Sequence, residues 1–263
     1  MNISLPKLRT RTLPALILCC GIVGLIFRLL ITVTAIDGKG LLIPWHPAWV
    51  CMWLMTAAAA AILILGVLPV RGPAAHKAAF PRSLYGAVGC FLAAISALMT
   101  VVNHFRSGAV SVPGILGPVL FFLQGAVFFL AVAAFVLAGL CRLFGRKTNF
   151  LFHVVICLYF ALEMLDLYRT WSFDPQLHEY CFQLFACIAL TAMAYQLAAF
   201  DMGRGSHRKI WAAGLAAVYL CCLAATSGLF FITGGIWAFV NLSSLRRPRQ
   251  RKTVEAEVPA ITE

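Results

Sequence analysis

Charged side chains are scarce in this sequence. Only 11% of its 263 residues are charged, whereas 62% are hydrophobic and the mean hydropathy is +0.92. A soluble domain carries roughly 25% charged residues, so this composition excludes an ordinary soluble protein. The long apolar segments instead predict an all-α fold, a polytopic membrane helix bundle with short connections and no separate soluble domain.

Acidic residues are especially few, since nine Asp and Glu stand against 21 Lys and Arg and give a formal net charge of +12. A basic chain can bind nucleic acid, but here the basic residues lie in short clusters between apolar segments, which is the pattern of membrane topology. We therefore expect the lipid bilayer, and no nucleic acid, as the main partner. The basic cytoplasmic face could in addition bind anionic lipid or an acidic protein partner.

The sequence also lacks the short motifs of intramembrane and metal-dependent catalysis. It contains no HExxH, no CxxC, no GxSG-type serine with a matching histidine, and no paired glutamates followed by an arginine. We therefore predict a protein that is not an enzyme and has no cofactor and no metal site. His46, His104 and His178 share the outer side, yet their spacing is not typical of a metal site. The ten cysteines lie in or at the ends of apolar segments, as core residues do.

No small-x-small cleavage site follows the first apolar segment, whose basic start at Lys7, Arg9 and Arg11 is otherwise similar to a signal peptide. We therefore predict that this segment is retained as a membrane span. Eight spans are expected, at about residues 13–34, 50–70, 84–102, 115–140, 150–168, 181–200, 210–226 and 229–244. The last two share one long apolar run with a possible turn at Thr226 to Gly228, so a single span is the alternative there.

The distribution of Lys and Arg decides between seven spans and eight. Cytoplasmic loops collect basic residues, and with eight spans 17 of the 21 fall on the same side of the membrane. With seven spans the run RRPRQRK, Arg246 to Lys252, would lie outside, against this pattern. We therefore predict that both termini are cytoplasmic, that residues 1–245 form a single transmembrane bundle, and that residues 246–263 form a disordered cytoplasmic tail.

Two carboxylates interrupt the fifth apolar segment. Tyr159, Glu163, Asp166 and Thr170 follow one another at helical spacing, so on a helix they form one narrow stripe. Carboxylates within a membrane commonly cost a few kcal/mol each, and they usually face a bundle interior or a water-filled cavity. His153 lies on the same segment but off the stripe, and we expect it to be a buried core histidine whose hydrogen bonds are satisfied.

A basic residue lies at a similar depth in the first span. Arg28 is placed about 9 Å below the outer end of that span, at about 1.5 Å per residue. Because the first and fifth spans both run outward, Arg28 could pair with Glu163 or Asp166; the alternative is that its side chain reaches up to the lipid headgroups. The expected binding residues of this outward-facing polar pocket are Arg28, Tyr159, Glu163, Asp166 and Thr170.

Two functions fit such a pocket. The first is solute binding, or a role as a transport component, because polar groups within a bundle commonly mark solute pathways. The second is a non-catalytic membrane interaction or assembly protein, in which the same polar cluster is a structural lock between helices. The sequence favours the first function and leaves the second open.

The segment YRTWSFDPQLHEYCF and the later AAFDMGRG resemble a group of uncharacterised bacterial multi-pass membrane proteins. The residues that carry this resemblance are Trp171, Asp174, Pro175, Tyr180, Phe182, Ala199 and Phe200. The resemblance implies no activity. It implies the bacterial cell (inner) membrane as the location.

Overall fold

The computed structural model describes residues 5–35, 43, 45–68, 73–74, 80, 82–107, 116–171 and 177–245. Within these ranges the chain forms eight α-helices and two strands of two residues each, which confirms the expected all-α class. The helices are α1 (Leu5–Thr34), α2 (Pro47–Val67), α4 (Leu84–Ser107), α5 (Leu116–Phe144), α6 (Phe150–Trp171), α7 (Leu177–Asp201), α8 (His207–Leu223) and α9 (Leu229–Ser244). The expected tail over residues 246–263 lies outside the described residues.

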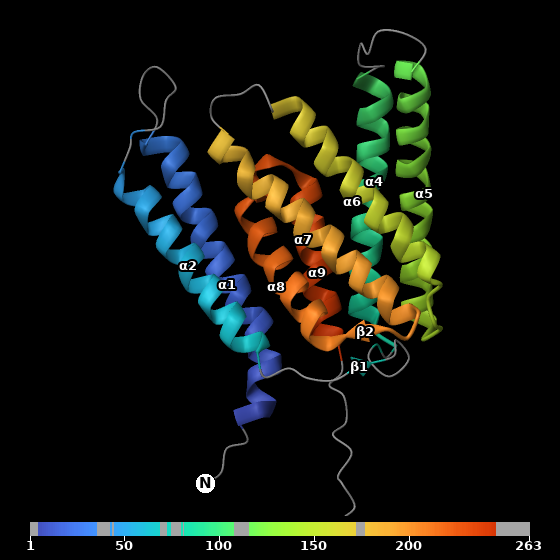
Figure 1. Cartoon of the computed structure of the whole chain (residues 1–263), viewed down its shortest axis with the longest axis horizontal. Helices are drawn as coiled ribbons and strands as arrows, with labels where there is room; N and C mark the ends of the chain where they lie inside the picture. The colour runs from blue at the N-terminus through green and yellow to red at the C-terminus, as the bar shows by residue number, and fades with distance from the viewer. Residues whose placement is uncertain are drawn as a thin grey trace, which may run out of the picture.

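Consecutive helices run in alternate directions through the bundle (Figure 1). The start of α1 and the end of α9 therefore lie at the same end, at the bottom of Figure 1. At that end the strands β1 (Pro73–Ala74) and β2 (Gly205–Ser206) pair antiparallel and tie the connection after α2 to the connection after α7. We call this end of the bundle the inner end and the opposite end the outer end.

Six of the described helices are long and apolar enough to cross a membrane. They are α1, α2, α4, α5, α6 and α7, whose most apolar windows have hydropathies between 1.6 and 2.6. The two remaining helices, α8 and α9, contain 17 and 16 residues. The chain is therefore a multi-pass membrane protein, and only the last two helices are short for a full crossing.

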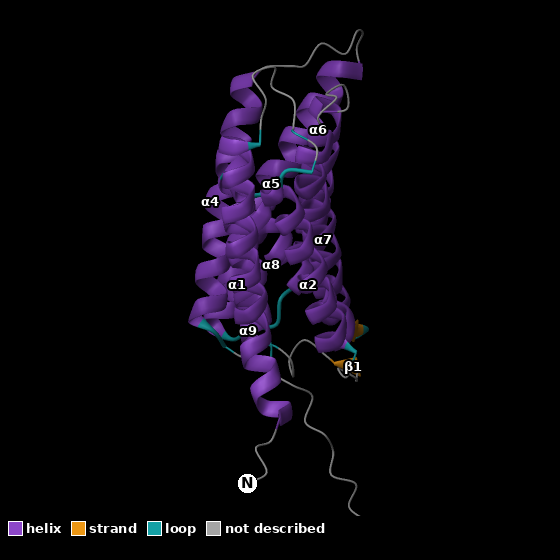
Figure 2. Ribbon diagram, turned by 90° about the vertical axis from the view of Figure 1, so that its left-hand side faces the viewer, coloured by secondary structure: helices purple, strands orange, loops and turns teal. Residues whose placement is uncertain are grey.

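Helices α8 and α9 form a hairpin inside the bundle, as two views at right angles show (Figure 1, Figure 2). Helix α8 packs against α1, α2 and α7 as well as α9, and α9 also packs against α4. Ten of the 17 residues of α8 are buried. By contrast, large apolar side chains on the peripheral helices are exposed, among them Val33, Leu54 and Phe122. The peripheral helices thus present a surface that suits lipid and cover most of α8, while α9 keeps an exposed apolar edge at Leu229, Ile232 and Ile236.

The hairpin turn divides what was one apolar run in the sequence. Helix α8 ends at Leu223, a 3-10 turn covers Ala225–Ser227, and α9 begins at Leu229. Gly228, between them, has a φ of 152°, in a region that glycine adopts far more readily than other residues. The run therefore forms two helices, and their break lies where the turn was expected.

Glycines bring α1 close to α8. A Cβ atom at Gly21 would lie 2.8 Å from the Cβ of Cys222, and one at Gly24 would lie 2.7 Å from a methyl carbon of Leu223. Both distances are shorter than a normal contact; the Leu223 methyl could rotate away, but the Cβ of Cys222 is fixed to the backbone, so a side chain at Gly21 would require the two helices to separate. Small residues commonly allow such close packing of membrane helices. The consequence is that Arg28, one turn beyond Gly24, lies next to the end of α8.

Candidate functional site

The polar stripe of α6 passes from the core to the surface of the bundle. Tyr159 is buried with 1% of its surface exposed, Glu163 is half-buried, and Asp166 and Thr170 are exposed. The stripe therefore leaves the packed interior between Glu163 and Asp166. Of the predicted site residues, the structure brings Tyr159 and Glu163 together in the bundle, and it leaves Asp166 and Thr170 nearer the outer end.

A threonine of the neighbouring helix α4 completes this part of the site. The Thr100 hydroxyl lies 3.2 Å from the Tyr159 hydroxyl, and either group can be the donor. The Thr100 side chain also lies beside the carboxyl group of Glu163. One carboxyl oxygen, Oε1, is enclosed and has no hydrogen-bond partner among the described residues. Thr100 was not predicted, because nothing in its own segment distinguishes it from the other hydroxyl residues of the spans.

The hydroxyl group of Thr170 is used within its own helix. Its Oγ1 donates a hydrogen bond of 2.9 Å to the backbone carbonyl of Asp166. Threonine commonly forms this bond in helices, and it needs no ligand. The Asp166 carboxylate itself is exposed at the outer part of α6.

Arg28 is buried against the central hairpin, away from the α6 stripe. Its guanidinium donates to the backbone carbonyl of Leu223, the last residue of α8, and it lies 5.9 Å from the ring centre of Phe182. The last carbonyls of a helix lack partners within the helix and carry partial negative charge, so a cation is favourable there. No ion pair joins Arg28 to Glu163 or Asp166 in the described part of the chain.

Further polar contacts fasten the outer end of the hairpin. The Tyr219 hydroxyl of α8 lies 2.9 Å from the Thr56 hydroxyl of α2. Gln183 of α7 donates a hydrogen bond of 2.7 Å to Ser227 in the turn. Together with Arg28, these contacts connect the hairpin to α1, α2 and α7.

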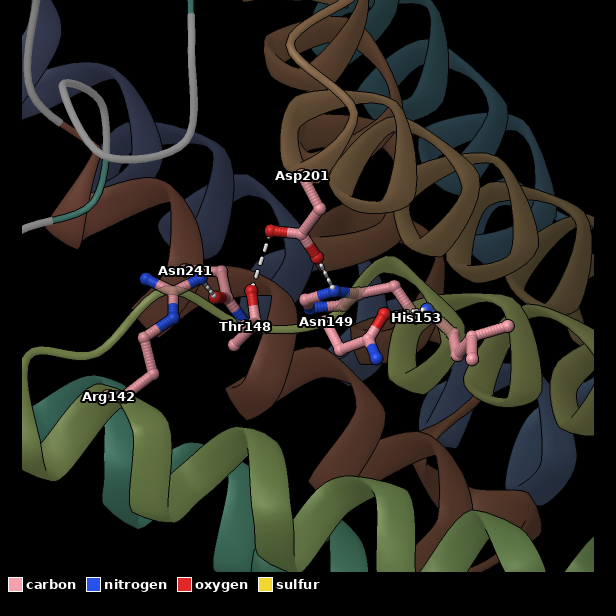
Figure 3. A network of polar contacts seen from close by, with 7 residues as sticks. Arg142, Thr148, Asn149, His153, Asp201 and Asn241 are labelled. Carbon is pink, nitrogen blue, oxygen red and sulfur yellow. Dashed lines mark hydrogen bonds and ion pairs between the residues drawn. The ribbon is translucent and has the colours of Figure 1, made fainter.

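A second polar cluster lies at the inner end, where Figure 3 shows Asp201 between Thr148 and His153. The Thr148 hydroxyl donates to one carboxyl oxygen of Asp201 at 2.6 Å, and Nδ1 of His153 lies 2.6 Å from the other oxygen. All three residues are buried, at 2%, 3% and 4% exposure for Thr148, His153 and Asp201. The expectation that His153 is a buried, satisfied core histidine is therefore confirmed.

Arg142 extends this inner cluster towards α9. Its Nη2 donates to the side-chain oxygen of Asn241 at 2.8 Å (Figure 3). Its guanidinium also lies 4.0 Å from the ring centre of Phe80. Nη1 is enclosed and has no hydrogen-bond partner among the described residues. Arg142 itself lies within the last turn of α5 and is only 3% exposed.

An aromatic layer separates the two polar regions. It consists of six rings from α5, α6 and α9: Phe128, Phe135, Tyr159, Phe160, Phe230 and Trp237. The Tyr159 ring contacts Phe128 edge-on at 5.6 Å and Phe230 at 5.9 Å between ring centres. Edge-to-face packing at these distances is favourable and leaves little space for water. Glu163 lies one helical turn beyond this layer, on its outer side.

Histidines and cysteines of the described part of the chain do not form a metal cluster. Among those residues there is no group of three or more His, Cys, Asp or Glu that could hold an ion. The His46 side chain accepts from the backbone of Ala48 at the start of α2, and the His104 ring stacks on Phe121 at 4.2 Å. Local structure accounts for both histidines, and His178 lies outside the residues whose side chains are described.

Comparison with known proteins adds no family to these observations. No family model, no curated protein and no solved structure matches the chain.

Proposed function

We propose that this protein spans the bacterial inner membrane eight times, with both termini in the cytoplasm, and binds a small solute from the outer side as a component of a transport system. Glu163 is the binding carboxylate in this proposal, and the hydroxyls of Tyr159 and Thr100 lie next to it. Asp166 and Thr170, nearer the outer end, meet the solute first. Arg28 supports the site indirectly by holding the end of α8.

The orientation is supported by the charge at the two ends of the bundle. Exposed basic residues gather at the inner end, namely Arg82, Arg146, Lys147, Arg204, Arg208 and Lys209. Loops rich in Lys and Arg favour the cytoplasmic side. Both ends of the described chain lie at this inner end of the bundle (Figure 1), which supports two cytoplasmic termini.

The enclosed oxygen of Glu163 carries the functional proposal. A buried polar atom without a partner costs roughly 1–3 kcal/mol, and a carboxyl group within the membrane adds to that cost. A structural role for Glu163 would require a partner that offsets the cost, whereas Arg28 binds elsewhere. A bound solute would supply the partner that the described residues do not offer to Oε1.

The chemistry of the site favours a particular kind of solute. Among the described residues, the charged side chain that interacts electrostatically with Glu163 is Asp166, which is also acidic. Two carboxyl groups and two hydroxyls attract a cation or a molecule that donates hydrogen bonds. We therefore expect a small cationic or amine-containing solute.

Native mass spectrometry of the protein, gently extracted from its own membrane, tests this proposal. We expect a small molecule bound in a fixed stoichiometry, and we expect Glu163→Gln to abolish its retention. Thr191→Val is the matched control, because the Thr191 hydroxyl bonds only within α7, to the carbonyl of Cys187 at 2.7 Å. Retention of the small molecule by Glu163→Gln, or its loss from both variants, would contradict the role of Glu163.

A specific observation favours the second function, a non-catalytic assembly protein. Arg28 contacts both Leu223 of α8 and Phe182 of α7, so it fastens three helices without needing a solute. If the polar groups serve only assembly, the same mass spectra will show a co-purifying protein and no small molecule. The basic inner end is then the surface where that partner is expected.

A further inference from the structure

Among the described residues, no cation acts on the carboxyl group of Glu163. Within the same part of the chain, the titratable groups that interact with it are Tyr159 and Asp166 from its own helix and Cys187 from α7, and α4 places the neutral hydroxyl of Thr100 beside it. His104, one turn further along α4, directs its Nε2 to the carbonyl of Phe121 at 3.0 Å. An ionised carboxylate here would have no counter-charge among the described residues, and its enclosed oxygen Oε1 would have no hydrogen-bond partner among them. The carboxylic acid is therefore the form that this environment accommodates.

The two hydroxyls beside Glu163 are able to adjust to either form of the carboxyl group. Thr100 and Tyr159 bond to each other at 3.2 Å, and either can be the donor. A hydroxyl group rotates freely to suit its partner. Thr100 can therefore accept a hydrogen bond from the acid, or donate one to the carboxylate, with little rearrangement of the helices.

The geometry also sets the side from which a proton arrives. Inward of Glu163 the aromatic layer is tightly packed, and Tyr159 and Phe160, which belong to it, are 1% and 2% exposed. Outward of Glu163 the next residue of the stripe is Asp166, one turn away and exposed. Between Glu163 and the outer end, Asp166 is therefore available to carry a proton. Between Glu163 and the inner end, the packed aromatic layer excludes water.

From these contacts we infer that Glu163 is a proton-binding site loaded from the outer side of the membrane, with Asp166 as the relay. Loading forms one O–H bond on the carboxyl group, and unloading returns that proton through Asp166 to the outer water. The inference rests on the proposed function in one respect: a cationic solute at Glu163 displaces the proton and takes its place. Solute binding and proton binding are then mutually exclusive at one carboxyl group.

Infrared spectroscopy of the purified full-length protein in lipid nanodiscs tests the proton site without any solute. We expect a carbonyl stretching band of a protonated carboxyl group that disappears as the pH is raised. Glu163→Gln should lose this pH-dependent band, whereas the matched control Thr191→Val should retain it. Should Glu163→Gln fail to fold, Glu163→Asp provides the second variant, since it keeps the acid and should shift the frequency of the band.

Sidedness is tested in sealed vesicles that carry the protein in one known orientation. Raising the pH on the outer side of the protein should remove the band, and raising it on the inner side should leave the band unchanged. A band that is identical in the wild type and in Glu163→Gln, unshifted in Glu163→Asp, or sensitive only to the inner pH overturns the inference. The proposed function fails separately, through the absence of a bound small molecule, because the infrared measurement contains none.

Discussion

At the scale of single residues, Asp201 shows how a membrane protein keeps a carboxyl group at the inner end of its bundle. The carboxyl group is enclosed by Thr148 from the connection before α6 and by His153 from α6 itself. Both of its oxygens have a partner, in contrast to Glu163, where Oε1 has none among the described residues. A satisfied buried carboxyl group stabilises the fold, whereas an unsatisfied one suggests a binding role.

Removal of the Asp201 side chain should therefore destabilise the protein strongly. Asp201→Ala leaves His153 and Thr148 buried without their partner, and we expect the free energy of unfolding to fall by about 3 kcal/mol. Reversible unfolding in detergent micelles measures this change. Asp166→Ala removes an exposed carboxylate from the same pair of helices and should cost less than about 1 kcal/mol. Equal losses in the two variants would show that the inner cluster is not a stabilising element.

The sequence revealed one of these carboxyl groups and not the other, for a physical reason. Tyr159 and Glu163 are four residues apart, so the helical period alone placed them on one face. His153 and Asp201 are 48 positions apart in the chain, and their contact depends on how α6 packs against α7. The sequence correctly indicated that His153 is a satisfied core residue, but its partner could not be found without the fold.

At the scale of helices, Arg28 acts on the end of α8. Its guanidinium bonds to the carbonyl of Leu223, directly before the 3-10 turn and Gly228. Helix ends inside a membrane need such partners because no water is present to supply them. The charge pattern located Arg28 in the outer part of the first span. It gave no indication that Arg28 would bind a backbone carbonyl of α8 instead of a carboxylate of α6.

Replacing Arg28 should loosen the hairpin locally. We expect Arg28→Met to lower the free energy of unfolding by about 2 kcal/mol, the size of a hydrogen bond to a charged group. Hydrogen exchange should become faster in residues 220–228 and stay unchanged in α5. If exchange in the hairpin is the same in the variant and the wild type, Arg28 does not hold the end of α8.

An exchange of charges separates this arrangement from an ion pair between α1 and α6. The double variant Arg28→Glu with Glu163→Arg would restore a pair if the two side chains were partners. Because Arg28 binds Leu223, we expect the double variant to be less stable than either single variant. Recovery of stability in the double variant would contradict the contact with α8.

At the scale of the whole molecule, the bundle is built around its shortest helices. The apolar runs predicted where helices form, because each run is long and continuous, but they carry no information on which helix lies in the centre. That position follows from packing, since Gly21 lets α1 approach α8 closely and Gly234 of α9 lies against Leu190 of α7. If α8 and α9 cross the membrane, as the eight-span topology predicts, their contacts with α1, α2, α4 and α7 would let 17 and 16 residues suffice.

The position of the hairpin turn relative to the membrane is the test of the eight-span topology. Helix α8 rises about 25 Å at about 1.5 Å per residue, somewhat less than a hydrocarbon core of about 30 Å. In the eight-span topology the turn is nevertheless reached from the outside, because Thr226 is exposed in the bundle.

We expect Thr226→Cys to react with a membrane-impermeant maleimide in intact cells, and Lys147→Cys to react only after the cells are permeabilised. The wild type, labelled in parallel, corrects for the ten native cysteines. Labelling of Thr226→Cys only after permeabilisation would mean that α8 and α9 do not reach the outer side, and Glu163 would then lie in a bundle with six crossings.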